Sequence, residues 1–248
     1  MKYPVSAVLI TKNEEKRIGA TLDALQWCDE IIVVDSGSTD TTVAICTAKG
    51  CKVTHHPFEN FGKQKQLAVS LAKNNWVLAV DADEVLTPAL SKEIPEKLFS
   101  QPNPYKGYKI KMSHVFMGKV LRFGGESNKT YLRLFDKTAG QFNDKAVHEE
   151  VILTGETAVL KNRIMHYSYE DLQDYFTKFN QYTSMAANKL ADKKPKATWY
   201  IGIKFFITFF QLYFIRGLIL DGYNGFVWAM VSSFYPFIKY AKHRELKS

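Results

Sequence analysis

The stretch VLAVDADEVL, residues 77–86, places Asp81, Asp83 and Glu84 directly after an apolar run. Carboxylates this close together repel one another, so the arrangement is costly unless a cation or a hydrogen-bond network stabilises it. Mg²⁺ or Mn²⁺ would do so, because both prefer oxygen ligands and Mg²⁺ is commonly bound by one or two carboxylates together with substrate phosphates. The spacing fits a solvated acidic loop equally well, and by itself it does not choose between these interpretations.

Two further polar clusters follow apolar runs earlier in the chain, ITKNEE at residues 10–15 and VVDSGSTDTT at residues 33–42. Each begins where a hydrophobic run ends, as the acidic stretch does. Whether the three clusters belong to one site depends on the elements that carry them.

Four short apolar or β-branched runs have the composition of strands covered on both faces, at residues 5–10, 31–34, 52–54 and 76–80. Between them, residues 14–27 and 63–73 repeat apolar side chains at helical spacing. This alternation predicts an α/β fold, a Rossmann-like and mostly parallel sheet flanked by helices. Ligands bind beyond the carboxyl ends of such strands, so the three polar clusters are expected at one edge.

Beyond the fourth strand the pattern changes. Residues 102–160 contain shorter strand-like runs separated by Gly and Asn turns, which predicts a mixed extension of the sheet. Ser168 and Asp171 resemble a capping box, so a helix is expected to begin at Ser168.

The C-terminal segment, residues 199–248, is strongly apolar but interrupted by Lys204, Gln211 and Arg216. We therefore expect a catalytic domain over residues 1–198 followed by helices that lie in a membrane interface. Packing of these helices onto the globular domain or onto a dimer partner is an alternative, and a transmembrane hairpin is a third.

The chain has 248 residues and a net charge of +8, so its surface attracts polyanions such as nucleic acid, phosphorylated small molecules or an anionic membrane. Its three cysteines match no paired metal or redox spacing, which favours reduced thiols in the cytosol. The first 15 residues meet acidic side chains too soon for a signal peptide. We expect the chain to begin in the cytosol.

Taken in order, ITKNEE, VVDSGSTDTT and LAVDADE resemble the nucleotide-sugar-binding half of glycosyltransferase family 2, whose catalytic domain has the GT-A fold. The resemblance implies that Asp81 is the first acid of the family's D-x-D motif, near the ribose and the metal. It implies that Asp83 ligates the metal, Mg²⁺ or Mn²⁺.

The same resemblance assigns the nucleotide side of the site. Asp35 would accept a hydrogen bond from the base, and Thr11, Asn13 and Glu14 would line the base and ribose. The segment GKQKQLA stands where the family has a Gly followed by an Arg-Asn pair. That pair is absent, and Lys63 would replace its charge.

Inverting transfer needs a base that takes the proton from the acceptor hydroxyl as its oxygen attacks the anomeric carbon. The segment AVHEEV stands where the family carries this carboxylate. The resemblance favours Glu149, with Glu150 in reserve. His148 would orient the acceptor or be a structural histidine.

The middle segment and the apolar C-terminus resemble bacterial β-glucosyltransferases of lipopolysaccharide core biosynthesis. This resemblance implies a single transfer of glucose from a UDP-linked donor to an anionic, lipid-linked acceptor. Arg122, Lys129, Arg133 and His148 would contact that acceptor. The stretch GGESNKT, residues 124–130, departs from the pattern of many relatives, so the acceptor itself is left open.

Other functions fit parts of the sequence. A relative could act on polyprenyl phosphate or on another cell-envelope glycan. A sugar-phosphate nucleotidylyltransferase would show a Gly-rich loop after the first strand, and TKNEEKR contains no glycine. A membrane adaptor or nucleic-acid binder would explain the charge and the apolar tail but not three polar clusters, so we expect no nucleic-acid partner. An oligomer is possible on the sequence.

Overall fold

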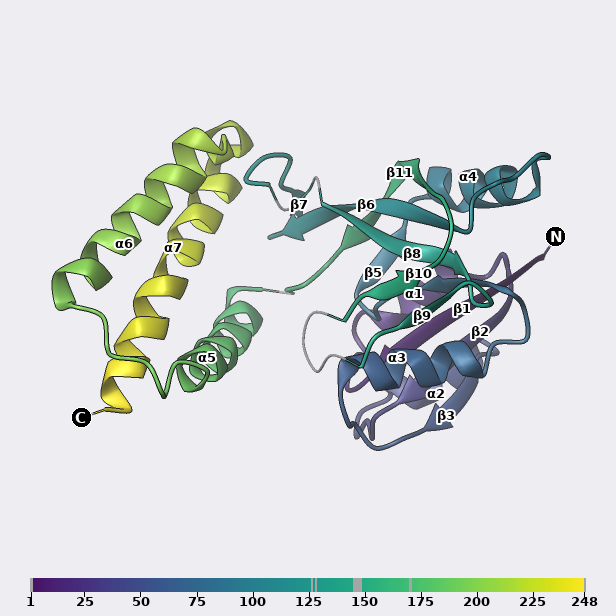
Figure 1. The fold of residues 1–248 in the computed structure, drawn as a ribbon, viewed down its shortest axis with the longest axis horizontal. Coiled ribbons are helices and arrows are strands. Elements are labelled where there is room, and N and C mark those ends of the chain that lie inside the picture. The colour runs from purple at the N-terminus through teal and green to yellow at the C-terminus, as the bar shows by residue number, and fades with distance from the viewer. Residues whose placement is uncertain (1, 126, 128, 145–148, 170, 248) are drawn as a thin grey trace. The chain divides into compact units, whose positions relative to one another are not determined.

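The computed structural model describes residues 2–125, 127, 129–144, 149–169 and 171–247. The chain forms two compact units (Figure 1), the first made of Met1–Met112 and Lys129–Tyr167, the second of Ser113–Asn128 and Ser168–Ser248. The expected boundary between residues 198 and 199 therefore falls inside the second unit. That residues 1–198 suffice for catalysis stays a prediction.

Four parallel strands build one half of the sheet in the first unit, in the order β3-β2-β1-β4. They are β1 (Tyr3–Thr11), β2 (Cys28–Asp35), β3 (Lys52–His55) and β4 (Trp76–Ala79). All four expected strands are confirmed. Because β1 lies between β2 and β4, with Thr11 opposite Asp35, the polar clusters after these three strands follow one edge of the sheet.

The sheet continues through β8 (Thr130–Asp136), β6 (Gly107–Phe116), β11 (Thr157–His166) and β5 (Glu84–Leu86). β8 pairs antiparallel with β4, and β11 pairs antiparallel with β5. Two further strands, β9 (Gly140–Phe142) and β10 (Val151–Leu153), form a small sheet of their own. The mixed extension expected over residues 102–160 is confirmed and runs on to His166.

Helices cover both faces of the sheet because alternate side chains of each strand point to opposite faces. Val5, Ala7 and Leu9 of β1 join a buried cluster on the face of α1 (Ile18–Ala24), α2 (Thr42–Ala48) and α4 (Pro88–Phe99). Val8 joins the cluster on the opposite face, under α3 (Phe61–Ser70).

The helix expected over residues 14–27 is shorter, because α1 begins only at Ile18. The preceding residues form a loop that is held by the neighbouring cluster, with the Glu14 N–H donating to Thr42 Oγ1 at 2.8 Å. Thr42, in the polar cluster at residues 33–42, thus holds Glu14 of the cluster at residues 10–15 in a loop before the helix.

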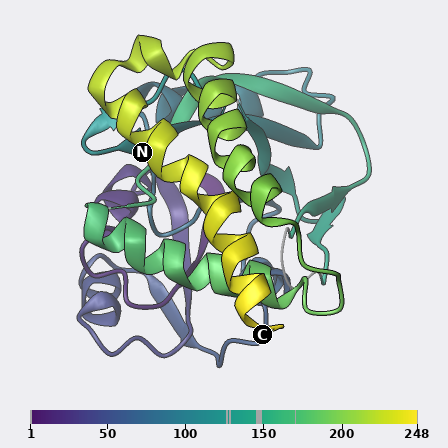
Figure 2. The same cartoon turned by 90° about the vertical axis from the view of Figure 1, so that its left-hand side faces the viewer.

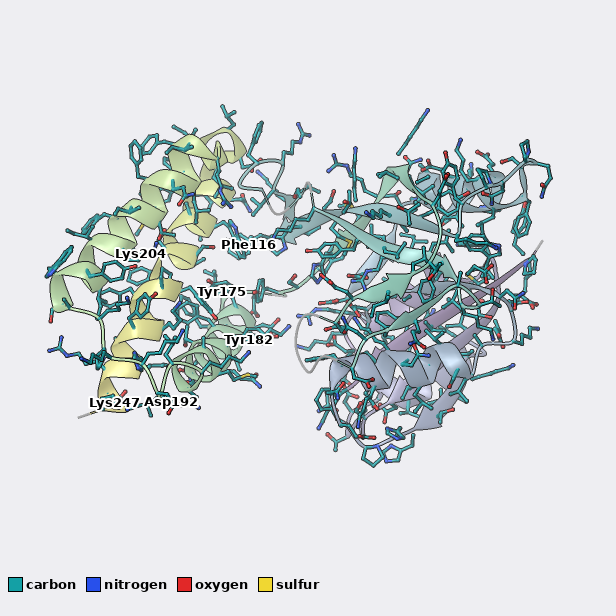
Figure 3. All side chains as sticks on the ribbon, viewed as in Figure 1. Phe116, Tyr175, Tyr182, Asp192, Lys204 and Lys247 are labelled. Atoms are coloured by element: carbon teal, nitrogen blue, oxygen red, sulfur yellow. The ribbon has the colours of Figure 1, made fainter. Side chains whose placement is uncertain are left out.

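In the second unit, α5 (Leu172–Asn188), α6 (Thr198–Phe210) and α7 (Gly222–Glu245) pack together. Figure 2 shows α6 and α7 side by side and antiparallel, with α5 crossing them. A short π-helical turn, Gln211–Ile215, and a 3₁₀ turn, Leu218–Asp221, join α6 to α7. The core of this unit consists of Phe116 and Leu121 from the end of β6 and the loop containing β7 (Lys119–Val120), and of Tyr175 and Val231 from the helices (Figure 3).

The start of α5 corrects the predicted capping box. Helix α5 begins at Leu172, and its N-cap is Asp171, whose Oδ1 accepts from the Asp174 N–H at 2.8 Å. Ser168 lies outside the helix, and its carbonyl accepts from Lys178 Nζ. The carboxylate satisfies an orphan N–H of the first turn, which is the role assigned by sequence to the serine.

Lys242 joins the end of α7 to the middle of α5. Its ammonium donates to Asn180 O at 2.9 Å and to Asn180 Oδ1 at 2.6 Å, and it also reaches the hydroxyls of Thr183 and Ser184. We expect Lys242→Met to lower the free energy of unfolding by about 1 kcal/mol, because these acceptors lose a charged donor. Urea unfolding measures this loss. Lys247→Met, at an exposed lysine just past the same helix, is the control, and an equal loss there would contradict the prediction.

Candidate active site

Asp81 lies two residues after the end of β4, and a tight turn sets its side chain beside Glu84. The Val80 N–H donates to Val8 O at 3.1 Å, which keeps the chain alongside β1 up to this point. The Glu84 N–H donates to Asp81 O at 3.0 Å, while Glu84 Oε2 accepts from the Asp81 N–H at 3.0 Å. The turn therefore brings two carboxylates together at the carboxyl end of the strand.

Two cationic side chains neutralise this pair. Lys65 of α3 places its Nζ 2.7 Å from Asp81 Oδ1 and 2.8 Å from Glu149 Oε1. Arg133 of β8 places Nη2 2.8 Å from Asp81 Oδ2 and also contacts Glu84 Oε1. Both oxygens of Asp81 are thus engaged by cations, and Lys65 connects Asp81 to the proposed base, Glu149.

The pKa shifts follow from this arrangement. Burial alone would raise the pKa of Asp81, but the charges of Lys65 and Arg133 outweigh it and hold that pKa far below its usual range. Burial raises the pKa of Glu84 to about 7, in spite of the opposing charge of Arg133. The pKa of Lys65 is raised, because Asp81 and Glu149 more than offset its burial. Asp81 therefore stays ionised at any physiological pH.

Asp83 lies two residues after Asp81, just before β5, which pairs with β11. The Tyr167 N–H donates to Asp83 O at 2.9 Å, and His166 Nε2 lies 3.4 Å from Asp83 Oδ2. Burial would lower the pKa of His166, but the hydrogen bond and charge of Asp83 dominate and raise it. The sequence offered no local signal for His166, which is 83 positions away and reaches Asp83 only through the pairing of β11 with β5.

A divalent cation fits these residues only in part. Within the described part of the chain, no group of three or more His, Cys, Asp or Glu side chains could hold a metal alone. Asp83 offers a carboxylate oxygen, which suits Mn²⁺ or Mg²⁺ if substrate phosphates supply further oxygens, whereas His166 offers a nitrogen, a donor that these cations favour less. Asp81 could join them only if Lys65 or Arg133 moved, so its predicted role as a direct ligand stays a prediction.

At the carboxyl end of β2, Asp35 lies opposite Thr11 of β1. Asp35 Oδ2 accepts from the N–H groups of Gly37 and Ser38, at 2.9 and 3.0 Å, and Oδ1 accepts from the Ser38 hydroxyl. A carboxylate oxygen accepts two hydrogen bonds, so Oδ1 retains capacity for a ligand. Thr11 Oγ1 is buried and has no partner among the described residues. An unpaired buried hydroxyl is costly, which is consistent with a ligand contact there.

Asn13 and Glu14 hold the loops rather than extending from them. Asn13 adopts a positive φ of 55°, and its Oδ1 accepts from the Thr39 N–H at 2.8 Å. Its own N–H donates to Ser38 Oγ at 2.9 Å. These bonds tie the loop after β1 to the loop after β2, so Asn13 shapes the edge on which Asp35 lies. Direct contact of Asn13 or Glu14 with a nucleotide stays a prediction.

Lys65, and not Lys63, lies beside Asp81. Lys63 was expected to replace the charge of the family's Arg-Asn pair on the nucleotide side, and that role stays a prediction. The side chain of Lys63 is 50% exposed and pairs with Glu59, whereas that of Lys65 is 9% exposed. Helical spacing could have distinguished them, because Lys65 lies on the same stripe as the buried Ala68, Val69 and Ala72. Lys63 lies off this stripe.

The remaining predicted residues lie in different places. Glu149 is half-buried next to Lys65, whereas Glu150 is exposed, and its carbonyl accepts from the Asn143 N–H. His148 lies outside the described residues. Lys129 is exposed in the first unit, and Arg122 is exposed in the second, where its N–H donates to Asp221. Arg133 lies within the acidic cluster, against Asp81 and Glu84, and its contact with the acceptor stays a prediction.

Sequence comparison identifies relatives of this chain. A model of the family described as glycosyl transferase family 2 matches residues 6–144. The chain is 35% identical over 256 residues to an uncharacterized glycosyltransferase of Rickettsia felis, an alignment that covers 97% of this chain and 89% of the relative. It is 28% identical over 252 residues to the lipopolysaccharide core biosynthesis glycosyltransferase LpsC of Rhizobium meliloti, covering 97% and 92%.

Solved structures are more distant. S. aureus TarS has a TM-score of 0.49 at 17% identity, covering 100% of this chain and 90% of that one. Glucosyl-3-phosphoglycerate synthase of Mycobacterium tuberculosis, solved with Mn²⁺ and UDP among its ligands, has a TM-score of 0.38 at 24% identity, covering 45% and 44%. Neither similarity is close enough to carry a statement about donor or metal. The sequence matches show that this chain belongs to glycosyltransferase family 2.

Proposed function

We propose that this glycosyltransferase moves a hexose, glucose from a UDP-linked donor, with inversion onto the inner core of lipopolysaccharide. The observation that carries the catalytic part is the contact of Lys65 with both Asp81 and Glu149. It supports a donor-binding carboxylate and a general base within one cluster, at the sheet edge where ligands bind in this class of fold.

In this proposal the nucleotide lies along the carboxyl ends of β1, β2 and β4. Asp35 accepts a hydrogen bond from the base through Oδ1, and the Thr11 hydroxyl bonds to the same part of the donor. Asp83, with His166 beside it, would hold Mg²⁺ or Mn²⁺, and such a cation would offset the charge of the leaving diphosphate. Arg133 keeps Asp81 and Glu84 in place.

Glu149 acts on the acceptor. Its carboxylate takes the proton from the acceptor hydroxyl while that oxygen attacks the anomeric carbon, and the bond from that carbon to the diphosphate breaks. Lys65 orients the carboxylate through its contact with Oε1. One glycosidic bond forms, and the nucleoside diphosphate leaves with the electron pair of the broken bond.

The acceptor assignment is supported by the relative named for lipopolysaccharide core biosynthesis. Such an acceptor is lipid-linked and phosphorylated, so the enzyme would work at the cytoplasmic face of the inner membrane. Lys129 of the first unit and Arg122 of the second are exposed cations suited to bind its phosphates, and His148, next to Glu149 in sequence, would orient it.

Asp83→Ala tests the metal and donor assignments together. Transfer from UDP-, GDP- and dTDP-sugars into a lipopolysaccharide extract, with Mg²⁺, Mn²⁺ or a chelator, identifies the donor first. We then expect Asp83→Ala to lower metal-stimulated transfer by at least about 100-fold, because the cation loses its carboxylate. Asp192→Ala, at an exposed carboxylate of the second unit, is the control. Full activity of Asp83→Ala would overturn the metal assignment. Labelling only of a polyprenyl phosphate extract would overturn the lipopolysaccharide assignment.

A further inference from the structure

One face of α6 exposes large apolar side chains along the whole helix. Trp199 and Phe206 are 68% and 69% exposed, and the same stripe includes Ile203, Ile207 and Phe210 and runs on to Phe214 in the π-helical turn after α6. These positions recur at three- and four-residue intervals, so they lie on one side of the helix. An exposed apolar stripe of this extent marks an interaction surface.

The opposite face of α6 is packed on α7 within the same unit. Phe205 and Phe234 have ring centroids 4.8 Å apart, and those of Tyr200 and Tyr240 are 5.9 Å apart. Ile201 is buried. The helix therefore has one face toward protein and one face without cover among the described residues.

Positive charge is concentrated in the same segment. Residues 191–248 contain nine Lys and Arg residues and three Asp and Glu residues, which accounts for most of the net charge of +8. Lys193, Lys194 and Lys196 are exposed just before α6, and Arg216 is exposed after it. An apolar stripe bordered by cations is complementary to a membrane that carries anionic lipid.

Lysines and tyrosines meet where the start of α6 lies beside the end of α7. Lys196 Nζ lies 5.5 Å from the centroid of the Tyr200 ring, and Lys239 Nζ lies 4.5 Å from that of Tyr240. Burial and then the charge of Lys204 (Figure 3) lower the pKa of Lys239, so an anion bound between these lysines would relieve their repulsion. Aromatic rings beside cations are typical of the headgroup layer.

We propose that α6 lies in the plane of an anionic membrane, with its Trp199–Phe214 stripe in the lipid and its flanking lysines on the headgroups. The stretch Thr198–Ile215 is long and apolar enough to span, with a mean hydropathy of 1.3 and 6% buried. Spanning would place Lys204 in hydrocarbon. Spanning would also pull α7 into the bilayer, because α7 packs on α6. The other side of α7 packs on α5, and α5 exposes the polar residues Gln173, Gln181 and Asn188.

Vesicle binding of the full chain tests this inference without reference to donor or acceptor. The protein is expected to sediment with vesicles of phosphatidylcholine and phosphatidylglycerol, less with phosphatidylcholine alone, and less at high salt. Phe206→Ser or Phe210→Ser should each weaken binding about tenfold, as for loss of one buried Phe side chain. Phe58→Ser, at an equally apolar residue that is 48% exposed in the first unit, should leave it unchanged.

The charged part has its own variants. Replacing Lys196, Lys204 and Lys239 by Gln should weaken binding to anionic vesicles by about fivefold per lysine and leave binding to neutral vesicles unchanged. Alkaline carbonate should release the bound protein. Absence of binding, equal losses in Phe58→Ser and Phe206→Ser, or retention after carbonate would overturn the proposal. So would a dimer that Phe206→Ser converts to monomer without changing vesicle binding.

Discussion

Glu149→Gln is expected to lower the turnover of sugar transfer by about 10²–10⁴-fold, because an amide cannot take the proton from the acceptor hydroxyl. The amide keeps the size of the side chain and can still accept from Lys65, which lies 2.8 Å from Glu149 Oε1. Donor binding should therefore change little. Initial rates with the donor found in the screen, together with donor affinity by calorimetry, measure both effects.

Glu150→Gln is the matched control. This neighbour is exposed, and its backbone carbonyl pairs with the Asn143 N–H at 3.0 Å, an interaction that the substitution leaves intact. Its rate should stay near that of the unmodified enzyme. If Glu150→Gln were inactive and Glu149→Gln active, the base would have to be reassigned.

Lys65→Met is expected to lower transfer by about 10²–10³-fold, the usual effect of removing one preorganised electrostatic contact in an active site. The change leaves Glu149 without its cation and leaves Asp81 with Arg133 alone. Donor affinity and turnover should both fall, because Lys65 contacts the proposed donor-binding carboxylate and the proposed base. Thermal unfolding of each variant shows whether the protein still folds.

Lys63→Met separates this effect from a general loss of positive charge on α3. Lys63 lies two residues away on the same helix, is exposed and pairs with Glu59 at 2.7 Å. Its rate and its midpoint of unfolding should change little, and Lys65→Arg should restore part of the activity by restoring the charge. Equal losses in Lys63→Met and Lys65→Met would show that proximity to Asp81 is not the reason.

Much of the fold could be predicted because its signals are local. Each parallel strand is a short apolar run that ends abruptly in polar residues, and both features can be read within ten positions. The order of these runs and of the helices between them was enough to predict that Asp35 and Asp81 lie at one edge of the sheet. The structure adds that β1 lies between their two strands. The family resemblance rested on the same local motifs.

The charge balance of the site could not be predicted in this way. The sequence identified a crowded acidic cluster and suggested a metal, whereas the fold places Lys65 and Arg133 against both oxygens of Asp81. Arg133 arrives because β8 runs antiparallel beside β4, with Leu134 opposite Leu78. Nothing within the segment around residue 133 indicates that partner.

The sequence by itself therefore determined where the strands end and which carboxylates follow them, since strand composition and the change to polar residues are properties of neighbouring positions. Only the tertiary structure decided which cations meet those carboxylates, that Lys65 rather than Lys63 faces Asp81, and that His166 lies beside Asp83. The physical reason is distance along the chain. These partners are 16 to 83 residues apart in sequence, and they meet only because the pairing of strands and the burial of one face of α3 bring them together.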